Sequence, residues 1–388
     1  MTRLFHGWLF LLAGIGLLAG PGCGATEQKA ATPPPGDPAG PRVPPPTPAT
    51  PLSSQAPGAS VASMPSGPLR VIAGRQYDVL GLAADASHLY WTRRGDGAVR
   101  RVAIDGGAPE IIASGQNQPH AIAVVGPTVF WTNIGKWPNN TPAADGSLQQ
   151  WVVGASTPTQ LSSGLRGPLA FAVDDTHVYV ALIYGAIYRV ARADGKVAVF
   201  AKGQDSPRGI ALDATHVYWT NLGRVGSGGA LAVASGSVNR KKKTGGAPSV
   251  LADSQQTSAD ITVDGQHVYW LASGIVRRVA KTGGVVADLA ASGIDSRESL
   301  RLVGDHLVYS HRGRVRAMPE PSAVLRVPKS GGNSELLLGA VPPGGPKLSK
   351  QGPSVHSEPC FEPSAIASNE RFLFVADSGC GKVLRLDL

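Results

Sequence analysis

Cysteine is scarce in this chain: only Cys23, Cys360 and Cys380 occur among 388 residues. A structural zinc site takes four Cys or His ligands, so three cysteines without suitably spaced histidines exclude the common zinc modules. The sequence also lacks Gly-x-Ser-x-Gly, phosphate-loop, His-Glu-x-x-His and Cys-x-x-Cys motifs. No signature of a serine hydrolase, a nucleotide-binding protein, a zinc protease or a thiol oxidoreductase is therefore present.

Apolar runs long enough to cross a membrane are also missing at the amino terminus. The run from Leu4 to Leu18 is too short to span a bilayer. It begins after the basic Arg3 and ends shortly before the small residues Gly20 and Gly22. This order is typical of a signal peptide, so we predict that residues 1–23 direct export.

The end of this segment resembles the lipobox of bacterial lipoproteins, with Cys23 directly after small residues, although Gly20 stands where such signals usually carry Leu. The resemblance implies that Cys23 is acylated and anchors the protein to a membrane. Gly24 is not the Asp associated with inner-membrane retention, which implies an outer-membrane lipoprotein. The alternative is ordinary cleavage near Ala25 and a secreted or periplasmic protein.

Large apolar side chains are almost absent from residues 24–68, which contain thirteen prolines between Pro33 and Pro68. Such a composition cannot form a core and favours extended conformations, so we predict a disordered linker. At about 3.1 Å per residue, it could reach on the order of 140 Å. The linker would hold the remaining domain, residues 69–388, away from the membrane.

A repeated unit fills the rest of the chain. It recurs seven times between Asp78 and Leu388, and its clearest copies lead from Gly209-Ile210-Ala211-Leu212-Asp213 and from Ile261-Thr262-Val263-Asp264 to a His-Val-Tyr-Trp segment. The position of the aromatic residue in the seven units is Tyr90, Phe130, Tyr179, Tyr218, Tyr269, Val308 and Phe374. Units of about 40 residues that cannot bury their own faces indicate a solenoid or a propeller.

The pattern inside each unit predicts strands. Apolar residues alternate with period two and are rich in Val, Ile, Tyr and Trp. Double-glycine turns such as Gly106-Gly107 and Gly245-Gly246 predict hairpins. We therefore expect an all-β, seven-bladed β-propeller with four antiparallel strands in each blade. Residues 69–73 would supply the last strand of the final blade. Six blades remain the alternative if residues 301–388 form one expanded blade.

The units resemble the YWTD, NHL and gluconolactonase-like propeller families over residues 78–388. The residues that carry this resemblance are Tyr90-Trp91-Thr92, Phe130-Trp131-Thr132, Tyr218-Trp219-Thr220 and Tyr269-Trp270. The fourth position of the YWTD pattern is acidic in that family. Here it is acidic only in the last unit, at Asp377, and is otherwise Arg93, Asn133, Leu182, Asn221, Ala272 or His311. The resemblance implies a fold rather than an activity, because propellers host many unrelated functions.

Several side chains recur at one position of the unit. We interpret the histidines as turn residues, because side chains of separate blades cannot converge on one metal ion. We expect the arginines to pair with a carbonyl or carboxylate of the adjoining blade, including the recurrent Asp85, Asp174, Asp213 and Asp264, and the tryptophans to pack between blades. The recurrent histidines are His88, His177, His216, His267 and His306, and the recurrent arginines are Arg101, Arg189, Arg240, Arg278, Arg326 and Arg385.

Cys360 and Cys380 align with two loops that leave the same face of the last blade, so we predict a disulfide in an oxidising compartment. The formal net charge is +9. For an exported protein this favours anionic lipid or glycan over nucleic acid as the partner. We interpret the basic run Arg240-Lys241-Lys242-Lys243 as a solvated strand edge that discourages strand addition.

Function is expected where the repeat is broken. Long connections follow the second strand at Asn133 to Gly146, Asn221 to Gly236 and His311 to Pro321, and the segment from Pro342 to Pro363 is extended. All should leave one face, where binding residues concentrate. The candidate binding residues on this face are Trp137, Asn139, Asn140, Arg224, Arg312, Arg314 and Arg316.

A second candidate site lies at the entrance of the central pore. The residues ahead of the first strands include Asp78, His120, Arg208, Asp260 and Glu298. Asp78, Asp260 and Glu298, with Asn133 or Asn221, could form an oxygen-rich calcium site of the kind that the gluconolactonase-like resemblance implies. A lyase acting through His120 is a weaker form of this idea.

Two functions therefore remain open. The first is a non-catalytic binding or scaffolding module without a cofactor, tethered at the bacterial cell envelope and recognising a protein, a glycan or another envelope component. The alternative is a calcium-dependent, lactonase-like hydrolase. The binding module is the preferred interpretation, because no convergent catalytic set is visible in the sequence.

Overall fold

The computed structural model describes residues 69–138, 141–223, 235–255, 258–291, 299–311, 322–340, 348–351 and 360–388. The predicted signal peptide, Cys23 and the predicted linker lie outside the described residues. The chain divides into two units, residues 1–63 and 64–388, and the described residues lie in the second. No helix among the described residues is long and apolar enough to cross a membrane.

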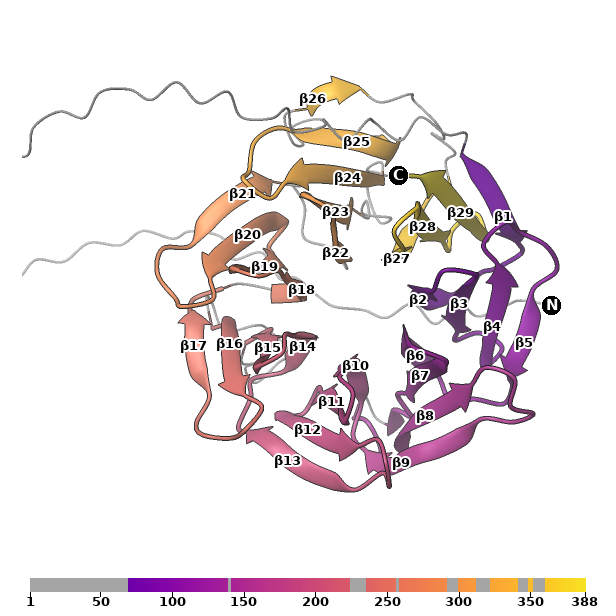
Figure 1. The fold of residues 1–388 in the computed structure, drawn as a ribbon, viewed down its shortest axis with the longest axis horizontal. Helices are drawn as coiled ribbons and strands as arrows, with labels where there is room; N and C mark the ends of the chain where they lie inside the picture. The colour runs from indigo at the N-terminus through magenta and orange to yellow at the C-terminus, as the bar shows by residue number, and fades with distance from the viewer. Residues whose placement is uncertain are drawn as a thin grey trace, which may run out of the picture. The chain divides into compact units, whose positions relative to one another are not determined.

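Seven sheets form a closed ring around a central axis, as Figure 1 shows, and each is one blade with its first strand innermost. Blades 1 to 3 comprise β2 (Val79–Ala84), β3 (His88–Arg93), β4 (Ala98–Ala103) and β5 (Glu110–Ala113); β6 (Pro119–Val125), β7 (Thr128–Asn133), β8 (Gly146–Val152) and β9 (Thr159–Leu165); and β10 (Pro168–Val173), β11 (His177–Leu182), β12 (Ala186–Ala191) and β13 (Val197–Lys202).

Blades 4 and 5 repeat this arrangement with β14 (Pro207–Leu212), β15 (His216–Asn221), β16 (Ser237–Lys242) and β17 (Ser249–Ala252), and with β18 (Ser258–Val263), β19 (His267–Ala272), β20 (Ile275–Ala280) and β21 (Ala287–Ala291). Blade 6 contains β22 (Leu300–Val303), β23 (His306–His311), β24 (Ala323–Pro328), β25 (Ser334–Gly339) and the added β26 (Leu348–Gln351). Blade 7 contains β27 (Pro363–Ser368), β28 (Phe372–Asp377), β29 (Lys382–Asp387) and β1 (Arg70–Gly74). The prediction of seven four-stranded blades is confirmed, with one extra strand in blade 6.

The two ends of the propeller meet in blade 7. Strand β1 pairs antiparallel with β29, with Arg70 opposite Arg385 and Gly74 opposite Lys382. The segment before the first repeat is therefore the missing fourth strand, as predicted. It closes the ring because a strand from one end of the domain completes a sheet built from the other end.

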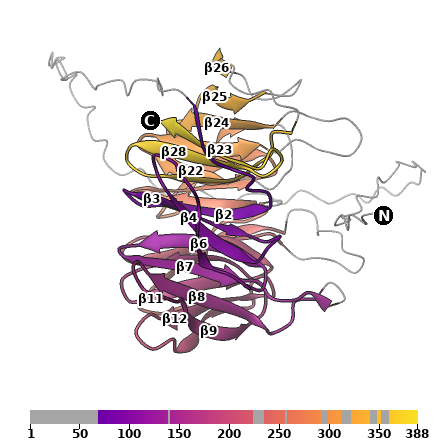
Figure 2. The same ribbon diagram turned by 90° about the vertical axis from the view of Figure 1, so that its right-hand side faces the viewer.

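Strand β26 is the departure from the repeat. It pairs in parallel with the outer strand β25 and lies outside it in both Figure 1 and Figure 2. The sequence did not predict this strand, because four residues of mixed polarity between Leu348 and Gln351 carry no strand pattern. Blade 6 is thus the only described blade whose outer edge is paired.

The core lies between blades rather than inside them. The rings of Trp91, Trp131, Trp219 and Trp270 are fully buried, and each belongs to a cluster with residues of the preceding blade. Trp219, for example, packs with Tyr179 and Phe200 of blade 3. The predicted interblade role of these tryptophans is confirmed. Large aromatic rings suit this role because they fill the wedge between adjacent sheets.

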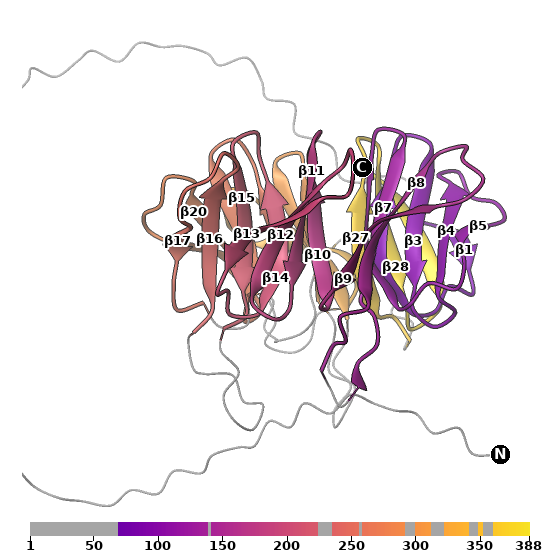
Figure 3. The same cartoon turned by 90° about the horizontal axis from the view of Figure 1, so that it is seen from below.

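The strands end on two opposite faces, which Figure 3 shows at the upper and lower ends of the strands. One face carries the turns between the second and third strands and the links from each blade to the next, and we call it the loop face. The two kinds of segment contact each other directly: the Gln76 N–H donates to Gly381 O, and the Gln204 N–H donates to Gly185 O. The opposite face, the turn face, carries the hairpins between strands 1 and 2 and between strands 3 and 4.

Candidate functional site

The pore-entrance residues lie at the start of the innermost strands, but their polar groups are engaged in contacts between blades. The half-buried His120 places Nδ1 2.8 Å from the backbone oxygen of Leu169 in blade 3. Asp260 accepts hydrogen bonds from the Leu300 N–H at 3.0 Å and from Arg301 Nη1 at 2.7 Å, both in blade 6. These side chains connect neighbouring blades at the inner wall.

The remaining candidates of the calcium set do not assemble around them. Asp78 is exposed at a link on the loop face, Arg208 is half-buried at the start of β14, and Glu298 lies outside the described residues. Among the residues that the structure describes, no group of three or more His, Cys, Asp or Glu side chains is placed to hold a metal ion. The calcium site stays a prediction. In its described part, Asp260 is the one half-buried carboxylate, and it forms an ion pair with Arg301.

Asn133 and Asn221 occupy equivalent buried positions in blades 2 and 4, which blade 3 separates in Figure 1. The Nδ2 group of Asn133 donates to Gln116 Oε1 and to Ser147 Oγ. Asn221 repeats this with Gln204 and Ser237. Each asparagine therefore connects the link before its blade to its third strand, and the two side chains belong to different blades.

A recurrent glutamine supports the fully buried tryptophans, and sequence inspection missed it. Its Oε1 accepts the indole N–H of the tryptophan fifteen residues later. The signal was present as a Gln at constant distance from Trp, but a polar residue in a link between blades carries no hydrophobic pattern. The four pairs are Gln76 with Trp91, Gln116 with Trp131, Gln204 with Trp219 and Gln255 with Trp270.

Small residues and hydroxyls join the blades near the pore. Thr92 Oγ1 donates to His120 O at 2.5 Å while accepting the Gly81 N–H. A Cβ atom on Gly81 would lie 2.3 Å from that same oxygen. Glycine is therefore required where blade 1 approaches blade 2 this closely. Thr220 and Gly209 make the equivalent contact to Ala259 O between blades 4 and 5.

On the turn face, three of the recurrent arginines donate to the next blade as predicted, whereas Arg101 and Arg326 pair with Glu110 and Glu335 of their own blades. Arg278 Nη1 donates to Lys329 O in blade 6 at 2.7 Å. Arg240 Nη1 makes the corresponding bond to Lys281 O in blade 5. Arg385 contacts Ile104 O and Asp105 in blade 1. The predicted pairing with Asp85, Asp174, Asp213 and Asp264 is not made by these three arginines.

Asp174, Asp213 and Asp264 bind lysines of the following blade instead. Lys281 Nζ lies 2.8 Å from Asp213 Oδ2, and Lys243 Nζ lies 2.8 Å from Asp174 Oδ2. Burial alone would raise the pKa of the Asp174 carboxyl, but Lys243 and the backbone N–H groups of Thr176 and His177 lower it to about 2. The pKa of Asp213 is lowered by the same kind of partners against the same effect of burial.

The histidines begin the second strands as predicted: the N–H of His88 donates to Asp85 Oδ1, and its Nδ1 lies 2.9 Å from Ser87 Oγ.

The basic run 240–243 is not a solvated strand edge. It lies in and just after the third strand β16, where Arg240 and Lys243 contact neighbouring blades, because β17 forms the edge.

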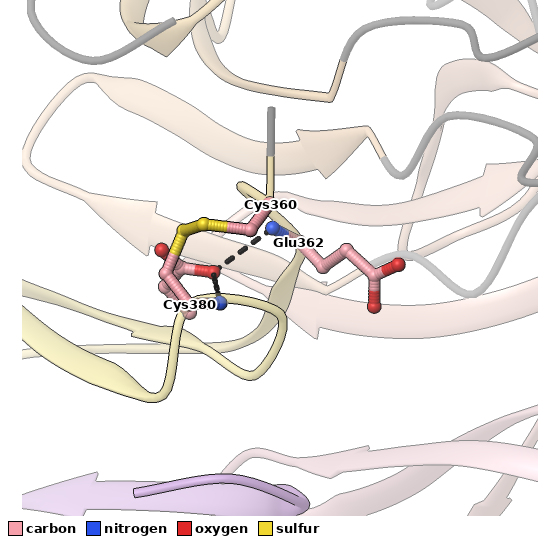
Figure 4. The surroundings of a disulfide bond; sticks show 4 residues. Cys360, Glu362 and Cys380 are labelled. Carbon is pink, nitrogen blue, oxygen red and sulfur yellow. Dashed lines mark hydrogen bonds between the residues drawn. A yellow bond between two sulfur atoms is a disulfide. The ribbon is translucent and has the colours of Figure 1, made fainter. Parts of the chain in front are cut away.

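The predicted disulfide is present, with Cα atoms of Cys360 and Cys380 5.1 Å apart (Figure 4). It joins the segment before β27 to the turn between β28 and β29. The carboxylate of Asp377 accepts the N–H groups of Glu362 and Cys380, so it holds the same two segments together. This disulfide fixes the loop face of the closing blade.

The candidate binding residues on the loop face are only partly described. Trp137 is half-buried in the connection from β7 to β8. The other six lie outside the described residues, namely Asn139, Asn140, Arg224, Arg312, Arg314 and Arg316. Their binding role stays a prediction. The strand bounds do place the long second-to-third-strand connections in alternate blades, after Asn133, Asn221 and His311.

Comparison with known proteins gives the fold and no further identity. No protein-family model and no curated protein matches the chain. The WD40 β-propeller domain of Doa1 is similar in structure, with a TM-score of 0.55 and 13% identity over 82% of this chain and 97% of that domain. A computationally designed protein, Ika8, gives a TM-score of 0.53 and 14% identity over 82% and 98%. The match to a chain of a nidogen/laminin complex spans 53% of this chain and 76% of that chain, with 19% identity and a TM-score of 0.42.

Proposed function

We propose that this protein is an exported, non-catalytic binding or scaffolding propeller, tethered at the bacterial cell envelope through acylated Cys23 and the proline-rich linker. The observation that carries the proposal is the state of the pore entrance. Asp260 and His120, the half-buried groups an active site there would use, are bonded to the neighbouring blade. The loop face, in contrast, carries long connections that the repeat does not require.

Export is supported by the disulfide, since such bonds persist mainly in oxidising compartments. The lipid anchor is tested by growing cells that produce the full chain with labelled palmitate. We expect label in the wild-type protein and none in Cys23→Ser, which should be released from the membrane fraction. Label-free wild-type protein in the soluble fraction would instead indicate a secreted or periplasmic protein.

The absence of catalysis is tested with the mature protein and a panel of lactones, with and without calcium. We expect no rate above background under either condition. A calcium-dependent rate that is lost in Asp260→Asn and in Glu298→Gln would establish the lactonase alternative and overturn the proposed function. Because Asp260 contacts Arg301, the thermal midpoint of the Asp260→Asn variant is measured alongside the rate.

A further inference from the structure

An exposed tyrosine on the loop face is held rigidly in place. Tyr77, in the link from blade 7 to blade 1, is 51% exposed. Its ring lies directly against Gly381, where a Cβ atom would come within 2.7 Å of ring carbons. Its backbone oxygen accepts a hydrogen bond from Arg93 Nε at 3.1 Å, and the preceding Gln76 N–H donates to Gly381 O at 2.8 Å. Stability alone does not require an aromatic ring that is fixed and also faces water.

Arginines outnumber carboxylates in this link and in the end of blade 1 that contacts it. Arg93 Nη1 and Arg100 Nη2 share a single oxygen of Asp96, at 2.9 and 2.8 Å. Arg75 and Arg94 are exposed, and neither makes an ion pair with any residue that the structure describes. The exposed Asp78 is the other carboxylate of the group. We call this group the Tyr77 cluster, and it comprises Arg75, Tyr77, Asp78, Arg93, Arg94, Asp96 and Arg100.

One donor within the cluster is buried without an acceptor. Arg100 Nε has no hydrogen-bond partner among the described residues. Its guanidinium is bound to Asp96 only through Nη2, and that oxygen is already shared with Arg93. Four guanidinium groups against two carboxylates leave the cluster positive, so charge complementarity selects an anionic partner.

From these contacts we infer that the Tyr77 cluster is the docking surface for an acidic segment of a partner protein. Tyr and Arg are the residues most enriched at the energetic centres of protein interfaces. A ring already fixed by Gly381 loses little conformational entropy on binding. The inference deepens the proposed function, since it names the class of partner for a binding propeller.

The test uses the mature full-length protein and immobilised acidic polymers, with affinity measured by biolayer interferometry at low and high salt. The probes are a random copolymer of glutamate and tyrosine, polyglutamate, and the polyuronate alginate. We expect saturable binding of the copolymer that weakens with salt. Tyr77→Ala and Arg94→Glu should each weaken it by roughly tenfold or more, as at an interface hot spot.

Lys242→Glu is the matched control, because it makes the same change of charge on the turn face, where Lys242 is exposed. Copolymer binding should be unchanged in this variant. Equal weakening in Arg94→Glu and Lys242→Glu would overturn the inference, since binding would then follow net charge alone. Preference for alginate at the same residues would overturn the assignment to a protein partner. Absence of saturable copolymer binding would overturn it as well.

Two features keep the outcomes distinguishable. Arg94 is exposed, so Arg94→Glu tests the surface even if Tyr77→Ala disturbs the contact with Gly381, and Tyr77→Phe should retain most of the affinity. The lactone panel is independent of this surface. Failure of the Tyr77 cluster leaves the binding propeller standing with its partner on other loops, whereas lactone hydrolysis overturns the proposed function whatever the Tyr77 variants do.

Discussion

Two seams of the ring both contain a buried apolar cluster, but they differ in the polar bonds that are added to it. Between blades 4 and 5, Arg240 donates to the backbone oxygen of Lys281, and the Lys281 ammonium returns to Asp213. Between blades 6 and 7, an apolar cluster dominates, with Val308 and Leu338 of one blade against Ile366 and Leu373 of the other. The polar seam fixes the orientation of adjacent blades through directional bonds, whereas the apolar seam depends on shape and exclusion of water.

The difference follows the regularity of the repeat. Blade 5 keeps the aromatic and the lysine of the unit, at Tyr269 and Lys281. Blade 6 has Val308 where the other units have an aromatic ring. The disulfide then staples blade 7, next to the irregular seam. Where the repeat is degenerate, an apolar cluster joins the two blades, and the disulfide adds a covalent link inside the adjacent blade.

The largest effect is expected at the apolar seam. Ile366 is fully buried against both blades, so Ile366→Ala should lower the free energy of unfolding by about 2–5 kcal/mol through lost burial and the cavity left behind. Urea unfolding followed by tryptophan fluorescence measures it. Ile366→Val, which removes one methylene, should cost about 0.5–1.5 kcal/mol. If Ile366→Ala destabilised the protein less than Ile366→Val does, this seam would contribute little to ring closure.

Removing the disulfide should have the second-largest effect on stability. The double variant Cys360→Ala, Cys380→Ala opens a loop of sequence separation 20 and should lose about 3 kcal/mol of stability. A reducing agent should lower the stability of the wild-type protein by a similar amount and leave the double variant unaffected. If reductant destabilised both proteins equally, the effect would not come from this bond.

Breaking the polar seam should cost less. Asp213→Asn removes the partner of Lys281, both side chains being largely buried, and should destabilise by about 1–3 kcal/mol. Lys281→Met should cost a similar amount. A double-mutant cycle isolates their coupling, and the double variant should lose clearly less than the sum of the single variants. Strict additivity would show that the two groups do not interact.

The smallest expected effect is a dependence of stability on pH that comes from the polar contacts and not from the apolar ones. The folded pKa values of Asp174, Asp213 and Asp264 are lowered, that of Asp174 to about 2. Their contribution to stability is therefore full above the unfolded value of about 4 and is lost as pH falls through the folded values. Urea midpoints should fall between about pH 5 and 2. The decline should be shallower in Asp213→Asn and unchanged in slope in Ile366→Val.

Much of the fold was predictable because the same strand and turn pattern occurs in each repeated unit. Alternating strands, the seven aromatic positions, the closing strand Arg70–Gly74 and the Cys360–Cys380 bond all followed from spacing and alignment. The added strand β26 was missed, since Leu348–Gln351 acquires a strand partner only through the placement of β25. For Arg240 and Arg278 the sequence predicted a carbonyl or carboxylate of the next blade but not which one, because a particular backbone oxygen leaves no trace in the sequence.

The candidate site was less accessible to prediction. The sequence suggested that Asp260 and His120 are available polar groups at the pore, but in the structure they contact Arg301 and Leu169 of the next blade. Tyr77 lies outside the repeated strands and was not recognised. Its importance depends on Gly381, about three hundred residues further along the chain, and on the arginines of β3 and β4.

The sequence by itself determined the strand order of the blades and the segment that closes the ring, and it favoured seven blades over six, because each unit repeats a local pattern whose two faces must be covered by the next. Only the tertiary structure decided which polar groups are consumed in holding blades together and which remain at the surface. That decision depends on distances between blades, and side chains such as Arg93 and Arg94, neighbours in sequence, end in different environments once the ring is closed.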